Sequence, residues 1–423
     1  MNKGLVIAAI FSFYSHLLRA EEPTFQWDWI LSTTTTKYQD SLLFGEPKEA
    51  QSQRVDGLID VQIDWDRWTG LFAANGQRMW SSDDSQSFDG ELIIQELFWQ
   101  GELDNSFIPV DVTLGKLRLD WGVGYGFRPL DIFKPYRRNP IGIQVEEGAG
   151  TALVSYFDAQ GEWSVVYTDS SWTQQQGYPI EEQSQQQGIG VRRYALKNRN
   201  EWQVIAYYDD VRKGLLAGSL VTVLDQAWEF HSSAVFQRKH LSIEQGEQLS
   251  PVALTHSDDS FQVLMGLNWA SSQGHNIILE YWYDDRSWGK DEWSQAFERV
   301  EALDQDTSTQ SIARSYASGL NLPNLMKHNV MFHWALDSSG WSHWDWSRNS
   351  LWLDNIEPTF DLLYSPEDGG LIATQWINYH AYDSGSAAFD VELAARLLTG
   401  KSRSLYANLS DKHMILLNLK GKF

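Results

Sequence analysis

The sequence contains no cysteine, which excludes a disulfide framework, thiolate metal ligands and a lipid-modified N-terminal cysteine. It also lacks long apolar runs. After residue 20 no stretch approaches the ~18 apolar residues of a membrane-spanning helix. Basic residues are scarce, with Lys+Arg 33 against Asp+Glu 56 and a formal net charge of -23. This balance disfavours nucleic acid and other polyanions as partners, and a membrane-spanning form of this chain would have to use strands.

Aromatic residues, by contrast, are abundant, with 21 Trp, 17 Tyr and 19 Phe. Outer-membrane barrels place Trp and Tyr in girdles at the two membrane interfaces, because these side chains have an apolar body and a polar tip. A secreted protein that binds sugars would be rich in Trp as well. Composition therefore leaves both classes open.

The N-terminus is typical of an exported protein. Lys3 precedes a mostly apolar stretch over residues 4–18, and Ala20 stands before the acidic Glu21 and Glu22. This order resembles a secretory signal peptide. We predict a signal peptide over residues 1–20 and a mature domain over residues 21–423.

The clearest period-two pattern lies at residues 59–66, where Ile59, Val61 and Ile63 alternate with Asp60 and Asp64. Successive side chains of a strand point to opposite faces. One face of this strand therefore suits lipid and the other suits a watery lumen. This alternation is typical of the strands of a membrane β-barrel.

Similar segments recur along the chain, many of them joined by very short links. We predict an all-β fold: a single transmembrane antiparallel β-barrel of about 18 strands, with 16 as the alternative, with tight turns at one end and long outer loops at the other. Residues 239–260 and 286–327 are two of the expected long links. The predicted strands are 27–36, 59–66, 69–80, 91–100, 107–119, 151–158, 163–169, 188–196, 202–209, 215–224, 228–237, 261–270, 276–284, 329–337, 341–353, 359–364, 372–382, 388–398 and 413–423.

A short helix is expected within one long outer loop, because Trp293, Phe297 and Val300 fall at helical spacing in residues 291–303. Two placements are open. The helix could pack over the mouth of the barrel, or it could cover only its own apolar face.

The C-terminus ends in Phe423, in register with Ile415 and Leu417 on one face of the last predicted strand. A terminal aromatic residue on such a strand is typical of a barrel-assembly signal. Gly421 departs from this pattern, because an apolar or aromatic residue is usual there.

The most distinctive segment runs from Gly115 to Gly126 as GKLRLDWGVGYG and continues through Pro129, Asp131 and Phe133. It resembles the Trp-Gly-x-Gly and Pro-x-Asp-x-Phe-x-Pro segment of porin-like bacterial outer-membrane barrels related to the alginate-export type. The resemblance implies a barrel that passes solutes across the outer membrane. An exporter of an anionic polymer would need a basic lumen, whereas the face at Asp60 and Asp64 is acidic, so neutral or cationic solutes fit better.

The same segment should leave the barrel wall after Trp121, because its prolines prevent regular ladder pairing and its glycines allow positive backbone torsions and close packing. It could fold inward as a constriction or form a solvated external loop. In the first case, basic and acidic groups would face one another across the pore and filter charge. The predicted pore-lining or constriction residues are Asp60, Gln62, Asp64, Asp66, Arg118, Asp131, Arg137 and Arg138.

Catalytic patterns are weak. His231 beside two serines, or His256 near Asp258, could be drawn into a hydrolytic site, but chance proximity explains them better. No His-x-x-x-His spacing occurs. We predict no catalytic residue, no metal site and no cofactor.

These observations predict a non-enzymatic outer-membrane channel or transporter for small neutral or cationic solutes. Its expected partners are outer-membrane lipid, lipopolysaccharide, the barrel-assembly machinery and the solute itself, with no nucleic acid. Two alternatives remain open: a plugged barrel with a scaffolding role, and a secreted all-β protein that binds or cleaves polysaccharide.

Overall fold

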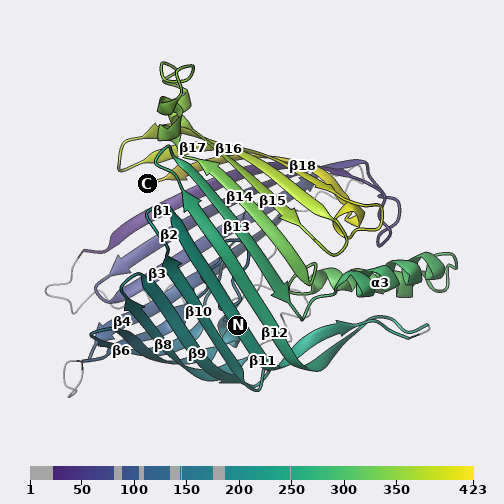
Figure 1. Cartoon of the computed structure of the whole chain (residues 1–423), viewed down its shortest axis with the longest axis horizontal. Coiled ribbons are helices and arrows are strands. Elements are labelled where there is room, and N and C mark those ends of the chain that lie inside the picture. Colours follow the sequence, from purple (N-terminus) through teal and green to yellow (C-terminus); the bar gives the residue numbers. More distant parts are fainter. Residues whose placement is uncertain are drawn as a thin grey trace.

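The computed structural model describes residues 22–80, 88–103, 109–133, 143, 145–174, 186–247 and 249–423. Its strands form one 18-stranded sheet, in which each strand pairs with its neighbours in the chain. β1 and β18 also pair, antiparallel, so the sheet closes into the barrel of Figure 1. The predicted fold and strand number are confirmed.

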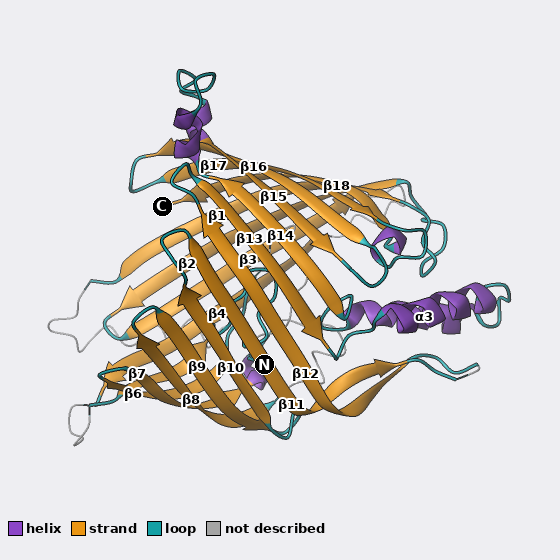
Figure 2. Cartoon of the chain, in the orientation of Figure 1, coloured by secondary structure: helices purple, strands orange, loops and turns teal. Residues whose placement is uncertain are grey.

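Long strands joined in sequence order make up most of the chain (Figure 2). They are β1 (Thr24–Tyr38), β2 (Gln51–Trp65), β3 (Trp68–Trp80), β4 (Phe88–Glu102), β5 (Asp111–Leu117), β6 (Ala149–Asp158), β7 (Gly161–Asp169), β8 (Gln187–Lys197), β9 (Asn200–Asp209), β10 (Leu215–Val223), β11 (Trp228–Glu244), β12 (Ala253–Ala270), β13 (His275–Asp284), β14 (His328–Leu336), β15 (Ile356–Tyr364), β16 (Leu371–Asp383), β17 (Ala388–Thr399) and β18 (Asp411–Lys422).

The two faces of the wall differ as period two requires. On β9, Val204 and Tyr208 are more than half exposed, at 54% and 56%, whereas Ile205 and Tyr207 between them are buried. Exposed apolar side chains recur on the outer face of the other strands, as Ile59 does on β2. Closure satisfies the backbone hydrogen bonds and leaves an apolar band that suits lipid.

The two ends of the barrel also differ. Tight turns such as residues 66–67, 159–160 and 198–199 lie at the end where β1 begins and β18 ends, which we call the short-turn end. The opposite end, the long-loop end, carries α3 (Lys290–Leu303), α4 (Gln310–Ser315) and η2 (Tyr316–Asn321) between β13 and β14.

Helix α3 confirms the predicted helix, and its apolar stripe packs on neighbouring loops. Trp293, Phe297 and Val300 are buried in a cluster with Leu241 of β11 and Tyr406 of the β17–β18 connection. Loops from different parts of the barrel thus meet at this end. The helix does more than cover its own apolar face.

Two of the predicted segments were wrong. Residues 341–353 do not form a strand but belong to a connection that contains η3 (Ser338–His343) and η4 (Leu353–Asn355). Residues 239–260 are not a long loop, because β11 continues to Glu244 and β12 begins at Ala253, so the hairpin extends beyond the wall (Figure 1). Alternation is weak in both places, so side-chain periodicity alone assigned them incorrectly.

The last strand closes the barrel with aromatic contacts. Phe423 stacks on Trp27 of β1, with ring centroids 4.5 Å apart. The Trp29 ring occupies the space beside Gly421 that a side chain there would need. The departure of Gly421 from the usual terminal pattern is therefore compensated by an aromatic residue of the neighbouring strand.

Within the described ranges, no helix is both long enough and apolar enough to cross a bilayer. The predicted signal peptide, residues 1–20, lies outside the described residues.

Candidate pore constriction

Residues 118–133 leave the wall after β5 and cross the interior of the barrel. Trp121, Leu130 and Phe133 pack with Ile205 of β9 and Val235 of β11. Phe127 packs instead with Leu264, Trp282 and Met331, which belong to β12, β13 and β14. The contacted side chains alternate with the exposed, outer-facing residues of their strands. A segment that begins at β5 and touches these inward faces must lie in the lumen, so we call residues 118–133 the inward segment.

The tip of the inward segment is held by one buried carboxylate. Glu280 of β13 accepts hydrogen bonds from the Tyr125 backbone N–H at 2.7 Å and the Gly126 backbone N–H at 2.8 Å. Its Oε1 also lies 2.8 Å from Nε2 of His231 on β11. Glu280 has no exposed surface, so its two carboxyl oxygens depend on these three partners among the contacts described.

Beside this contact, the Tyr125 side chain lies against the wall. Its ring centroid is 4.4 Å from that of His333, whose Nδ1 lies 2.7 Å from Asp361 Oδ1. Desolvation, with the nearby negative charges of Asp361 and Glu280, raises the pKa of Tyr125 to about 12. The phenol therefore stays protonated at neutral pH and can donate a hydrogen bond in the lumen, where the side chain is 53% exposed.

The glycines of the tip are required by close approach. A Cβ at Gly124 would clash with the Phe127 carbonyl oxygen and the Leu264 side chain, and one at Gly126 would lie 2.5 Å from Met331 Sδ. Neither position has a positive φ, whereas Gly115, at the start of the same sequence segment, has φ 141°. Close packing was predicted correctly, and the predicted positive torsion is found at Gly115 but not at the tip.

Asp131 links two parts of the inward segment to each other at its base. Its Oδ1 accepts hydrogen bonds from the backbone N–H groups of Trp121 at 3.0 Å and Gly122 at 2.7 Å. Arg128 approaches the same carboxylate at 3.7 Å. These contacts give Asp131 the geometry of a structural clamp, and its predicted contribution to the pore stays a prediction.

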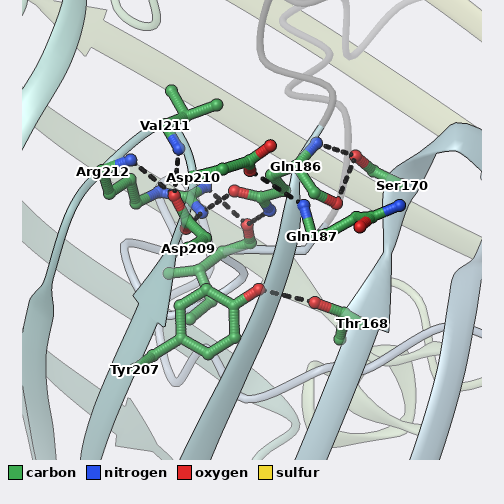
Figure 3. Close-up of polar contacts among 10 residues, drawn as sticks. Thr168, Ser170, Gln186, Gln187, Tyr207, Asp209, Asp210, Val211 and Arg212 are labelled. Atoms are coloured by element: carbon green, nitrogen blue, oxygen red, sulfur yellow. Dashed lines mark hydrogen bonds and ion pairs between the residues drawn. The ribbon is translucent and has the colours of Figure 1, made fainter.

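A second anchor lies where the segment reaches the connection between β9 and β10. Arg212 donates from Nη2 to the Ile132 carbonyl oxygen at 2.7 Å. It also donates from Nη1 to Asp209 Oδ2 at 2.7 Å, in the polar cluster of Figure 3. Asp209 is fully buried and also accepts from the backbone N–H of Val211 at 2.9 Å. Tyr207 on the same strand bonds Thr168 at 2.6 Å. The segment is therefore fixed to the wall at β13 and at the β9–β10 connection.

On the wall, β2 presents Asp60, Gln62 and Asp64 on the face that also carries buried Leu58. Leu58 packs on Val145, where the chain returns from the lumen to β6. Asp60 accepts from Gln95 Nε2 at 2.5 Å, and Asp64 accepts from Gln62 Nε2 at 2.7 Å and Thr69 Oγ1 at 2.8 Å. These three residues therefore lie on the inner face.

The other predicted residues are placed differently. Asp66 lies in the turn after β2, with φ 53°, so it does not line the wall. Arg118 lies close enough to act electrostatically on Asp60, but its own direct partners are Glu96 at 3.2 Å and Glu146 at 3.4 Å. Arg137 and Arg138 lie outside the described residues.

The inner faces of β15 to β18 carry a polar network near the short-turn end. His380 lies 2.8 Å from Asp390 and 3.3 Å from Glu357. Lys420 pairs with Glu392 at 2.8 Å. A polar inner face opposite an apolar outer face is the arrangement that a water-filled barrel needs.

The residues that hold the tip could not be paired from the sequence. Glu280 and His231 alternate correctly on their strands, which predicts only that they face the lumen. Their contact with each other and with the tip joins residues far apart in the chain. No local sequence pattern predicts such a contact. His231, which was considered above with two serines as a candidate hydrolytic site, instead contacts Glu280.

No protein-family model and no curated protein matches this sequence. Solved structures do. The outer membrane protein opdK from Pseudomonas aeruginosa superposes with a TM-score of 0.52 at 9% identity, covering 95% of this chain and 98% of that one. This chain has the fold of an outer-membrane protein.

Two further structures agree with this barrel fold. OccAB1 from Acinetobacter baumannii gives a TM-score of 0.53 at 9% identity, with 95% of this chain and 97% of that chain covered. OpdO from Pseudomonas aeruginosa gives 0.51 at 11% identity with the same coverage. At these identities the likeness concerns the fold alone.

Proposed function

We propose that this chain is an outer-membrane channel that passes small neutral or cationic solutes, with the inward segment as its constriction. The barrel likeness to opdK, the apolar outer face and the polar inner network all support this proposal. Outer-membrane lipid, lipopolysaccharide and the barrel-assembly machinery are part of the same proposal. We also include in this proposal the narrower relation of this chain to alginate-export barrels.

One observation carries the preference for cations. Asp60 and Asp64 are held by the neutral side chains of Gln95, Gln62 and Thr69. The cation of the nearby Arg118 is instead paired with two carboxylates. Negative charge on this side of the lumen is thus less compensated at close range than positive charge.

The inward segment has the properties of a selectivity element. It narrows the lumen, and its shape is preorganised by Glu280, Asp131 and Arg212. An acidic wall next to such a constriction raises the local concentration of cations and lowers that of anions. The solute would pass between the segment and the inner face of the wall.

The test is planar-bilayer conductance of the detergent-purified protein, with reversal potentials recorded across a salt gradient. We expect cation-selective steps, and we expect Asp60→Asn with Asp64→Asn to move the reversal potential toward zero. Asp66→Asn is the matched control, because it removes the same charge from the turn beyond β2. Equal shifts in wall and turn variants, or anion selectivity in the parent protein, would contradict the acidic-lumen proposal.

A silent but folded barrel would favour the plugged, scaffolding alternative, since the inward segment already occupies part of the lumen. Folding is checked independently by heat-modifiable migration on mild SDS gels. Extraction from cells only by detergent would support the outer-membrane location, whereas release without detergent would favour the secreted alternative.

A further inference from the structure

The connection between β14 and β15 is unusual for its end of the barrel. It spans residues 337–355 and includes η3 and η4, whereas several other links at the short-turn end are tight turns. Figure 1 shows it as a short coil that projects away from the barrel wall beside β16 and β17. We call residues 337–355 the outer connection.

An aromatic stack joins this connection to the outer face of the wall. Trp334 of β14 donates from Nε1 to Nδ1 of His275 on β13 at 3.2 Å. Trp344 packs on His275, with ring centroids 5.8 Å apart, and Trp346 stacks on Trp344 at 6.3 Å. His275 and Trp334 lie on the outer, lipid-facing side, because Glu280 and His333 occupy the inward positions of the same strands. The stack therefore continues the lipid-facing surface into the outer connection.

The far part of the outer connection is strongly exposed and apolar. Trp346 is 69% exposed, Leu351 78% and Trp352 62%. Asp345 and Arg348 lie among them and pair with each other at 3.1 Å. Large apolar groups mixed with charged groups suit a membrane interface, where headgroups meet acyl chains.

A ring of exposed aromatic residues lies at the same end of the barrel. Its members stand near the short-turn ends of their strands, on the outer face, and are between a third and two thirds exposed. They are Trp27, Trp68, Trp163, Trp202, Trp228 and Tyr382. Such a ring marks the level of a membrane interface.

We propose that the outer connection lies in the membrane interface of the leaflet at the short-turn end, with Leu351 and Trp352 inserted between lipid headgroups. It extends the aromatic ring sideways and anchors β13 to β15 in that leaflet. This inference requires a membrane barrel but not a conducting one. Burial of an apolar face about 5–10 Å below the headgroups is the expected depth.

The chain has no cysteine, so single-cysteine variants report on one site each. Leu351→Cys and Trp352→Cys are labelled with a nitrobenzoxadiazole fluorophore and reconstituted in phosphatidylethanolamine and phosphatidylglycerol vesicles. Ser386→Cys, in the exposed turn after β16, is the aqueous control. Leu393→Cys, on the outer face of β17, is the lipid control. Quenching is measured with iodide in water and with nitroxides attached to lipid near the headgroup.

We expect iodide to quench positions 351 and 352 several-fold less than position 386, and the shallow lipid nitroxide to quench them strongly. Quenching by iodide equal to that of the control would overturn the proposal, because the connection would then stand in water. Protection from both quenchers would also overturn it, because the connection would then be buried against protein and not in the interface. If iodide quenched position 393 as strongly as position 386, the barrel assignment would fail instead, so the two failures are distinguishable.

Discussion

Two irregular connections of this barrel have similar aromatic content, but one lies inside the lumen and the other lies outside the wall. The inward segment, residues 118–133, buries Trp121 to 7% exposure within the lumen. The outer connection, residues 337–355, leaves Trp346 at 69% exposure outside the wall. Aromatic content therefore does not decide whether a connection enters the barrel.

The partners on the wall account for the difference. The inward segment presents backbone N–H groups to Glu280 and a carbonyl oxygen to Arg212, so its polar backbone is satisfied in the lumen. The outer connection begins on the aromatic pair His275 and Trp334 of the lipid-facing side. Polar inner and apolar outer surfaces thus select different segments, and the following variants test that contrast.

The largest effect on stability should come from placing a charge on the lipid-facing side of a strand. Ile59 is 49% exposed near the middle of β2, and Ile59→Arg should destabilise the barrel by about 2–4 kcal/mol, because a cation would face lipid near the midplane. The measurement is the urea midpoint of the reconstituted protein. Gln62→Arg is the control, since its side chain turns to the lumen. Equal tolerance of both changes would disprove the assigned facing of β2.

Releasing the tip should have the next largest effect. Glu280→Ala removes the acceptor of the Tyr125 and Gly126 N–H groups, and an unsatisfied buried donor costs about 1–3 kcal/mol. We expect a higher single-channel conductance with larger current fluctuations, because the tip no longer holds one position. Glu357→Ala, elsewhere on the inner face, should leave these fluctuations unchanged. A conductance identical to that of the parent protein would show that the segment does not limit the pore.

A side chain at the tip should act through sterics alone. Gly124→Val would clash with Leu264 and displace the tip, so we expect a changed conductance with the wall charges intact. Gly57→Ala is the matched control, because no atom lies within 4 Å of the position its Cβ would take. The readout is conductance together with reversal potential. A shift in reversal potential comparable to that of the Asp60 and Asp64 variants would argue against a purely steric role.

The smallest effect on conduction should come from the outer connection. Trp352→Ser should leave conductance and selectivity unchanged, because residue 352 lies outside the wall and is 62% exposed. Its expected consequence is weaker partition of the connection into lipid, measured with the label at position 351. A marked loss of conductance would mean that the two connections are coupled through the barrel.

The barrel and most of its strands were predictable from the sequence. Alternation at Ile59 to Asp64 predicts which side chains face lipid, because that pattern is local and has a period of two. The 18-strand barrel and helix α3 were confirmed, and the predicted role of Asp60 in the pore stays a prediction. Residues 341–353 were wrongly assigned as a strand, because they are rich in Trp but alternate only weakly, and they form 3-10 turns instead.

A closed antiparallel barrel follows from the local sequence, since each strand must present one face to lipid and the other to water. The folded barrel is needed to place residues 118–133 in the lumen, with Glu280 holding their tip and Asp131 clamping their base. It also decided that residues 337–355 turn outward. The physical reason is that strand facing is set within a few residues, whereas the fate of a connection depends on hydrogen-bond and packing partners that closure of the barrel brings together.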